Sequence, residues 1–219
     1  EANTESVVEF VLTTMLANLR NLHCVSGGLN QKEWDSFRDA SMTKKEFSET
    51  TLGIIGFGRI GSRLGMMAGQ LGFKVLFNDL LNIEETYGCS QVGTEQLLFE
   101  SDIISIHVDG RHENKRLCNA NMFRQMKVNV LFINTARGFV VDAYALTNFL
   151  KNSTAASAIL DVHDPEPITS DYPLLHLPNA TLYPHIACKT TTASINMGWV
   201  VKDIYSVLCD EQPAFAVKT

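Results

Sequence analysis

From Thr51 onward, short runs of β-branched and aromatic residues alternate with segments of helical periodicity, and this alternation constrains the fold most. Apolar strands separated by helices are typical of a parallel sheet covered on both faces. We therefore expect an α/β, doubly wound parallel sheet, with its ligand crevice at the carboxyl ends of the strands. The runs predict strands at residues 51–56, 74–78, 90–93, 102–108, 128–134, 156–162 and 180–184. Helices are predicted at residues 60–72, 94–101, 119–127, 142–152 and about 190–209.

The first fifty residues precede this pattern. Apolar residues at helical spacing predict a long amphipathic helix at residues 4–22, and Ser6, three residues before Glu9, fits a capping box at its start. A polar stretch at residues 25–49 carries Trp34 and Phe37, and we interpret it as a long connection or an arm that packs outside the domain. The helix and the arm carry more apolar surface than one domain needs.

A glycine-rich turn lies between the strand predicted at 51–56 and the helix that follows. Gly56, Gly58 and Gly61 have G-x-G-x-x-G spacing, a weak pattern by itself that gains meaning between a strand and a helix. The first glycine permits a tight turn, the second lets backbone approach a pyrophosphate, and the third lets the helix pack on the sheet. The phosphates then meet free N–H groups at the helix N-terminus. A turn without a ligand is the less favoured interpretation.

Asp79 ends the next predicted strand, eighteen residues after Gly61. A carboxylate at this position accepts hydrogen bonds from the adenine-ribose hydroxyls and repels a 2′-phosphate. Leu80 and Leu81 follow it without a Lys or Arg, so the sequence favours NAD over NADP. The alternative is an ordinary turn acid.

The sequence ILDVHDPEPI, residues 159–168, places Glu166 between two prolines just after a predicted strand. Proline restricts its own backbone and that of the preceding residue, so this carboxylate is held firmly. Asp and Pro also simply end many strands. His163 is the histidine nearest to Glu166 in the sequence, and His185 follows Tyr183-Pro184 at the end of the next predicted strand.

Composition excludes several classes of protein. The net charge of −6 and the absence of a Lys/Arg run argue against nucleic acid as the main partner. The apolar runs are too short for a membrane span, and we expect no secretory signal. Five scattered cysteines without a C-x-x-C pair suggest free thiols in a reducing cytoplasm rather than disulfides or zinc. A metal site formed by His163, Glu166 and His185 lacks recognised ligand spacing, so we expect no metal.

Several motifs in order resemble the D-isomer-specific 2-hydroxyacid dehydrogenases, a family that includes phosphoglycerate dehydrogenase and glyoxylate/hydroxypyruvate reductase. They are GIIGFGRIG, SDIISIHV, INTARGFVVDAYAL, AILDVHDPEP and YPHIACKT, and the likeness covers essentially the whole chain. The resemblance implies an NAD-binding Rossmann domain over residues 1–209, including an interdomain helix at 4–22. Residues 210–219 would return toward a substrate domain.

The resemblance also implies a catalytic trio. Arg137 matches the family's arginine that binds the substrate carboxylate and carbonyl. His185 matches the catalytic histidine, and Glu166 matches the acid that pairs with that histidine. A guanidinium suits the adjacent oxygens of a 2-oxoacid, and histidine titrates in the range that proton transfer needs. His163 ranks below His185 because it does not match the motif. Asp161 is expected to reach the nicotinamide amide, and His107 to lie near the cofactor through its backbone. The implied cofactor contacts are Gly56, Gly58, Arg59, Ile60, Gly61, Asp79, His107, Val108, Asn114, Thr135, Ala136, Arg137, Asp161, His185 and Ala187.

Two departures from the family pattern stand out. After SIHV the family usually continues with Pro and Leu, whereas this chain reads Asp109-Gly110-Arg111, and Asn114 stands where the family prefers Thr. An added negative charge here is expected to weaken cofactor binding. The chain also lacks roughly a hundred residues, a domain-sized piece, from which the family builds most of its substrate domain.

We therefore expect an oxidoreductase that transfers a hydride between NAD(H) and a D-2-hydroxyacid or 2-oxoacid, here as a cofactor-binding fragment of a cytoplasmic homodimer. One alternative is a corepressor-type module that binds NAD for regulation without significant turnover. Another is a degenerate domain that binds no nucleotide, which the Asp109 departure suggests.

Overall fold

A computed structural model describes residues 2–20, 22, 24–43 and 45–214 of the chain. Its strands form one sheet in the order β3-β2-β1-β4-β5-β6-β7, and each neighbouring pair is parallel. The predicted doubly wound sheet is therefore confirmed. The strands are β1 (Thr51–Ile55), β2 (Lys74–Asn78), β3 (Ser90–Gln91), β4 (Ile103–Ile106), β5 (Leu131–Asn134), β6 (Ser157–Leu160) and β7 (Ala180–Leu182).

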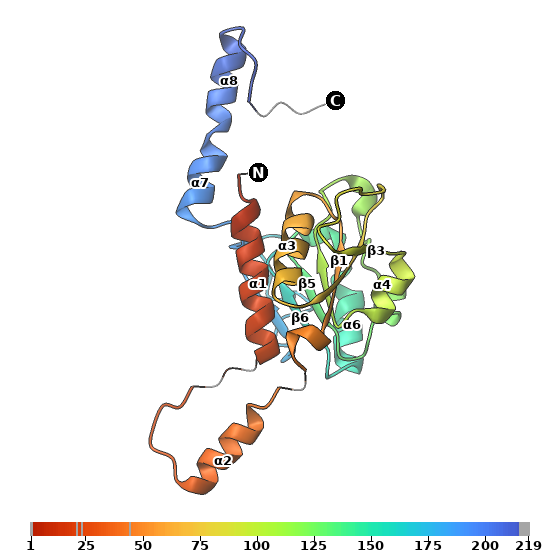
Figure 1. Cartoon of the computed structure of the whole chain (residues 1–219), viewed down its shortest axis with the longest axis vertical. Helices are drawn as coiled ribbons and strands as arrows, with labels where there is room; N and C mark the ends of the chain where they lie inside the picture. The colour runs from red at the N-terminus through yellow and green to blue at the C-terminus, as the bar shows by residue number, and fades with distance from the viewer. Residues whose placement is uncertain (1, 21, 23, 44, 215–219) are drawn as a thin grey trace.

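Helices cover both faces of the sheet (Figure 1). One apolar core lies between the sheet and α1 and α3, and a second lies between the sheet and α4, α5 and α6. The helices are α1 (Thr4–Arg20), α2 (Gln31–Ala40), α3 (Arg59–Gln70), α4 (Thr94–Glu100), α5 (Ala120–Arg124), α6 (Ala143–Asn152), α7 (Thr191–Gly198) and α8 (Val200–Leu208). Short 3-10 turns span Phe47–Glu49, His112–Asn114 and Gly138–Val140. None of the helices in the described residues combines the length and apolar character needed to cross a membrane.

The N-terminal segment differs from the expectation in three ways. Helix α1 begins at Thr4, so Ser6 lies inside it, buried, with its hydroxyl 2.8 Å from Thr190 Oγ1 rather than in a capping box. The helix ends at Arg20, and Leu22 is exposed. Its apolar residues pack on the domain's own core, so α1 has no surplus apolar face.

The stretch at 25–49 contains a helix that the prediction missed. Helix α2 starts with a capping box in which Asn30 Oδ1 accepts from Glu33 N–H at 3.0 Å and Glu33 Oε2 accepts from Asn30 N–H at 2.9 Å. The Asn-x-x-Glu spacing was present in the sequence and satisfies free N–H groups at the helix start. Figure 1 shows α2 projecting away from the sheet, as an arm would.

The predicted last helix is two helices. Helices α7 and α8 are separated at Trp199, which follows Gly198. Glycine lowers helix propensity by about 1 kcal/mol relative to alanine, which favours a break at this point. Together α7 and α8 extend from the body of the molecule beyond the N-terminal end of α1 (Figure 1).

Candidate active site

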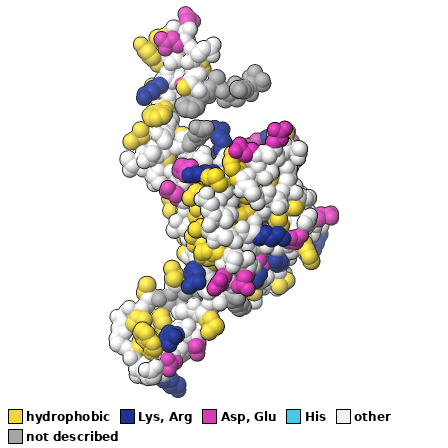
Figure 2. All heavy atoms as spheres, viewed as in Figure 1, with side chains coloured by type: hydrophobic (Ala, Val, Ile, Leu, Met, Phe, Trp, Pro, Cys, Tyr) yellow, Lys and Arg dark blue, Asp and Glu magenta, His cyan; other side chains and the backbone are white. Residues whose placement is uncertain are grey.

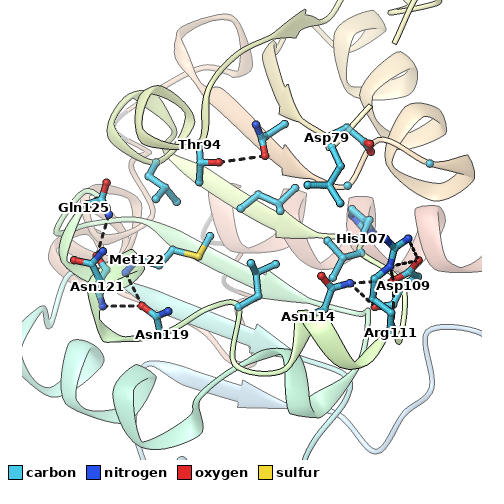
Figure 3. A pocket seen from close by; sticks show the side chains of 18 residues that line it. Asp79, Thr94, His107, Asp109, Arg111, Asn114, Asn119, Asn121, Met122 and Gln125 are labelled. Carbon is cyan, nitrogen blue, oxygen red and sulfur yellow. Dashed lines mark hydrogen bonds and ion pairs between the residues drawn. The ribbon is translucent and has the colours of Figure 1, made fainter. Parts of the chain in front are cut away.

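A cleft lies at the carboxyl ends of the strands, where the strand order reverses between β1 and β4. It consists of two adjoining cavities of about 520 and 430 Å³ that share Gly58, His107, Val108 and Asp109. We call them the Asp79 cavity and the Arg137 cavity. Figure 3 shows the Asp79 cavity, with Asp79 on one side and Asn119 and Asn121 on the other. Parallel α/β folds bind ligands at such a reversal.

The glycine-rich turn joins β1 to α3 at the floor of this cleft. Gly56 has φ +90°, a left-handed conformation that glycine adopts readily. A Cβ on Gly61 would lie 2.1 Å from the Gly56 carbonyl oxygen, so helix and turn pack in contact there. Gly58 faces open space, and no side chain caps the first N–H groups of α3. Open space in front of uncapped amides fits the pyrophosphate of a dinucleotide.

Asp79 follows β2 and is held by backbone amides. Its Oδ2 accepts from Phe57 N–H at 2.7 Å and its Oδ1 from Leu81 N–H at 3.0 Å. Each carboxylate oxygen can accept a second hydrogen bond, so ribose hydroxyls can still be bound. The same cavity is also lined by Arg111, a cation that the sequence reasoning did not place near Asp79.

His107, just after β4, has its ring Nε2 2.8 Å from Ser105 Oγ. Burial lowers the pKa of His107 to about 4, so the ring is neutral at pH 7. It therefore shapes the cleft without carrying charge.

The turn after β5 positions Arg137. Asn134 is fully buried; its Oδ1 accepts from Ala136 N–H at 3.0 Å and its Nδ2 donates to the Arg137 carbonyl at 3.1 Å. Arg137 Nη1 donates to the Ala136 carbonyl at 2.6 Å, and the side chain lines the Arg137 cavity. Thr135 Oγ1 is buried there and has no hydrogen-bond partner among the described residues, so it remains available to a ligand.

Asp161, just after β6, is 1% exposed and holds the loop after β7. Its two oxygens accept from Ile186 N–H at 2.7 Å and Ala187 N–H at 2.8 Å. These bonds fix the backbone beside His185, whose φ of +57° is uncommon for a residue other than glycine. The sequence led us to expect Asp161 to contact the nicotinamide amide, and it did not indicate that Asp161 also holds the loop after β7.

His185 and Glu166 form a pair at the edge of the cleft. His185 Nδ1 lies 2.9 Å from Glu166 Oε2, and the other carboxylate oxygen, Oε1, accepts from His163 N–H at 2.6 Å. Burial raises the pKa of Glu166, but the hydrogen bonds from His185 and His163 outweigh it and bring the pKa below its ordinary value. Since a carboxylate only accepts, Nδ1 carries a proton, and Nε2 is the ring atom left to exchange one with a ligand.

The two histidines near Glu166 differ in burial and direction. His163 is 8% exposed, and its Nε2 lies 2.8 Å from the Tyr183 carbonyl, which can only accept. His185 keeps 45% of its side chain exposed and lines the Arg137 cavity. Of these two histidines, His185 is thus the one that a ligand in the cleft can reach.

The loops after β5 and β6 touch at Gly138. A Cβ on this glycine would lie 1.9 Å from both the carbonyl carbon and the carbonyl oxygen of His163. Only a residue without a side chain allows this approach, which sets the distance between the loops that carry Arg137 and Glu166.

Most of the predicted site residues line the two cavities. Gly61 lies beneath the turn, and Glu166 lines a separate cavity of about 500 Å³ that it shares with His185. In the described part of the chain, no three His, Cys, Asp or Glu side chains gather as metal ligands. Sequence reasoning missed lining residues at the starts of α1 and α4, in α5 and in the loops; they include Asn3, Thr4, Val7, Thr94, Asn119, Asn121, Met122, Gln125 and Cys188. Only their position after strand ends or at helix starts could have indicated them.

Comparisons with known proteins agree with this geometry. A family model described as "D-isomer specific 2-hydroxyacid dehydrogenase, NAD binding domain" matches residues 12–187. The D-3-phosphoglycerate dehydrogenase of Haemophilus influenzae is 36% identical over 205 residues, covering 91% of this chain and 49% of that protein. The glyoxylate reductase of Thermofilum pendens is 34% identical over 219 residues, covering 96% and 64%.

Solved structures share the fold over nearly the whole chain. The D-lactate dehydrogenase of Aquifex aeolicus, complexed with NAD and lactic acid, has a TM-score of 0.79 at 29% identity and covers 96% of this chain and 68% of that one. D-2-hydroxyisocaproate dehydrogenase has a TM-score of 0.83 at 27% identity and covers 100% and 70%. The chain spans between 38% and 64% of the length of the curated relatives it matches.

Proposed function

The chain belongs to the D-isomer specific 2-hydroxyacid dehydrogenase family as an NAD-binding domain, and on that premise we propose that its protein interconverts a D-2-hydroxyacid and a 2-oxoacid. The observation that carries the proposal is the His185–Glu166 pair at 2.9 Å, beside a cavity that Arg137 also lines. NAD(H), when bound, supplies or accepts the hydride. Proton transfer and substrate binding fall to the chain's own side chains.

Each member of the trio has a distinct role in this proposal. Arg137 binds the substrate carboxylate and polarises the neighbouring carbonyl through its guanidinium. His185 gives a proton to the substrate oxygen in reduction and takes it back in oxidation, using Nε2. Glu166 orients the ring through the bond to Nδ1.

We assign the cofactor to the two cavities. The turn at Gly56, Gly58, Arg59 and Ile60 would face the pyrophosphate, with Gly61 beneath it, and Asp79 would face the adenine ribose. The nicotinamide half would lie in the Arg137 cavity. The proposed contacts there are His107, Val108, Thr135, Ala136, Arg137, Asp161, His185 and Ala187, whereas Asn114 lines the Asp79 cavity.

The exposed surface of α8 supports a proposed domain assignment. Helix α8 has no buried residue, and its Val200, Val201 and Ile204 are exposed. Figure 2 shows hydrophobic side chains along this extension. We propose that residues 1–209 are the NAD-binding unit and that residues 210–219, of which 215–219 lie outside the described residues, lead toward a substrate domain supplied by the rest of the protein.

We also propose a cytoplasmic homodimer. Because α1 packs on its own domain, the support for a dimer rests on the arm at α2, which buries none of its residues and leaves Trp34 47% exposed. All five cysteines, each within the described residues, are free thiols, which suits a reducing compartment. Sedimentation of the full-length protein as a stable monomer at micromolar concentration would contradict the dimer.

The proposed activity is tested with the full-length protein, NADH and a panel of 2-oxoacids. Replacement His185→Ala should lower kcat by about a hundredfold to ten-thousandfold, because it removes a general acid, and leave NADH affinity nearly intact. The matched control is His176→Ala, which removes a histidine outside the cleft. NADH binding without reduction of any 2-oxoacid would contradict the enzyme and favour a regulatory NAD-binding module.

A further inference from the structure

The loop at residues 109–114, which follows β4, closes on its own carboxylate; we call it the Asp109 loop. Arg111 Nε donates to Asp109 Oδ1 at 2.8 Å and to Oδ2 at 3.0 Å, and Arg111 Nη2 also donates to Oδ2. Asn114 Nδ2 donates to Asp109 Oδ1 at 2.9 Å and to the Asp109 carbonyl at 3.0 Å. Figure 3 shows the three side chains gathered together at one edge of the Asp79 cavity. The carboxylate is therefore saturated from within the loop.

The loop stands at the junction of the two cavities. Asp109 lines both of them, while Arg111 and Asn114 line the Asp79 cavity. On the other side, a Cβ placed on Gly110 would lie 3.6 Å from Cγ and Nε of Arg137. The glycine-rich turn, through Gly58, also lines both cavities. Any dinucleotide that occupies both must therefore cross between Gly58 and Asp109.

A carboxylate at this crossing opposes an anionic ligand unless its charge is cancelled. Hydrogen bonds from Arg111 hold the pKa of Asp109 below its ordinary value, so the carboxylate stays ionised. The same contact raises the pKa of the Arg111 guanidinium, and the charges of Glu113 and Asp79 add to this effect. Arg111 is thus a permanent cation between Asp109 and the carboxylate proposed to face the adenine ribose.

We propose that Arg111 is a positioning residue for dinucleotide binding: its fork on Asp109 keeps the loop closed and cancels the carboxylate that lines both cavities and would otherwise repel the pyrophosphate. The inference rests on the proposed cofactor placement and explains how the chain tolerates Asp109. Residues 109, 111 and 114, which differ from the family pattern, then compensate for one another, because Arg111 and Asn114 offset the negative charge of Asp109. Asp109 should therefore weaken cofactor binding only in a protein that lacks Arg111.

A double-mutant cycle on this chain tests the proposal, with NADH affinity measured by fluorescence or calorimetry in the parent, Arg111→Ala, Asp109→Asn and the double variant. Arg111→Ala should weaken NADH binding by about five- to tenfold, since the repulsion between an unpaired, exposed carboxylate and a doubly charged pyrophosphate is of about this size at the dielectric of water. Asp109→Asn should bind at least as tightly as the parent. Removing Arg111 from Asp109→Asn should cost less affinity than removing it from the parent, because the fork that orders the loop is already lost there and only one positive charge remains to be removed.

Controls separate this from general charge effects and misfolding. Arg38→Ala and Asp39→Asn make the same charge changes on the distant helix α2 and should leave affinity unchanged. Arg111→Lys keeps the charge, so it should retain most of the affinity even if Arg111→Ala proves poorly folded by circular dichroism. At 1 M salt the loss in Arg111→Ala should shrink, because exposed charges are screened.

Several results would overturn the inference. An equal loss on removing Arg111 from the parent and from the Asp109→Asn variant would mean that the guanidinium acts on the cofactor by itself rather than through Asp109. Loss of NADPH binding alone would assign Arg111 to a 2′-phosphate. Unchanged NADH affinity in every variant would overturn this inference only, whereas absence of NADH binding in the parent and all variants would overturn the cofactor placement and the inference with it.

Discussion

Replacing Gly138 with alanine should force apart the two loops that carry Arg137 and Glu166. The new Cβ would lie 1.9 Å from the carbonyl carbon and oxygen of His163, and ordinary contact begins at about 3.4 Å, so the backbone must retreat by about 1.5 Å. The obstacle is backbone rather than the end of a flexible side chain. It cannot move without disturbing the His163 N–H bond to Glu166.

The cost follows from this rigidity. Overpacking a core typically costs about 1–3 kcal/mol, and a backbone obstacle places Gly138→Ala near the upper end, at about 3 kcal/mol. For a domain of this size, about 1 kcal/mol shifts Tm by roughly 2–4 °C, so Tm should fall by about 6–12 °C.

Thermal unfolding followed by circular dichroism measures this shift. Gly69→Ala on α3 is the matched control, because Gly69 is helical and exposed and no heavy atom lies within 4 Å of its added Cβ. Since alanine favours a helix by roughly 0.5–1 kcal/mol over glycine, the control should hold or slightly raise Tm. On the same scale of about 2–4 °C per kcal/mol, a difference in Tm of less than about 2 °C between Gly138→Ala and the parent would refute the close approach of the two loops.

Three further substitutions test the cleft. Gly58→Ala meets no atom within 4 Å, so it should keep Tm while weakening NADH binding, and equal NADH affinity would show that no ligand approaches this backbone. Asp79→Ala should weaken NADH binding and narrow its preference over NADPH, whereas a parent that binds both equally would contradict the role of the carboxylate. Glu166→Gln removes the charge beside His185, so in the full-length protein the alkaline limit of the pH profile for 2-oxoacid reduction should move to lower pH. If that alkaline limit does not move, Glu166 is only a turn residue. Folding lowers the pKa of Glu166, so its ionised carboxylate stabilises the folded state at any pH above the pKa that it has in the unfolded chain. That stabilisation is lost as the pH falls through the pKa of the folded state. The Gln variant should therefore lose less Tm than the parent over that acidic window.

The sequence by itself determined the elements that depend on local patterns. Strand and helix periodicity, the glycine spacing and Asp79 at a strand end all follow from residues within a few positions of one another. These signals were enough to predict a parallel sheet with a dinucleotide crevice, whereas the trio was implied by the resemblance of several ordered motifs to the family. The helix at α2 was missed although its Asn30–Glu33 cap was local, because a polar segment with few apolar residues was interpreted as irregular.

Only the tertiary structure decided how those loops meet. His163 is nearer to Glu166 along the chain, yet packing buries its ring against the Tyr183 carbonyl and leaves His185 facing the cleft. Asp161 binds amides 25 and 26 residues away, and the charge of Asp109 is cancelled by a side chain whose direction no spacing reveals. Burial and side-chain direction are set by segments far apart in the sequence, so a linear pattern names the candidate groups and the packed fold selects among them.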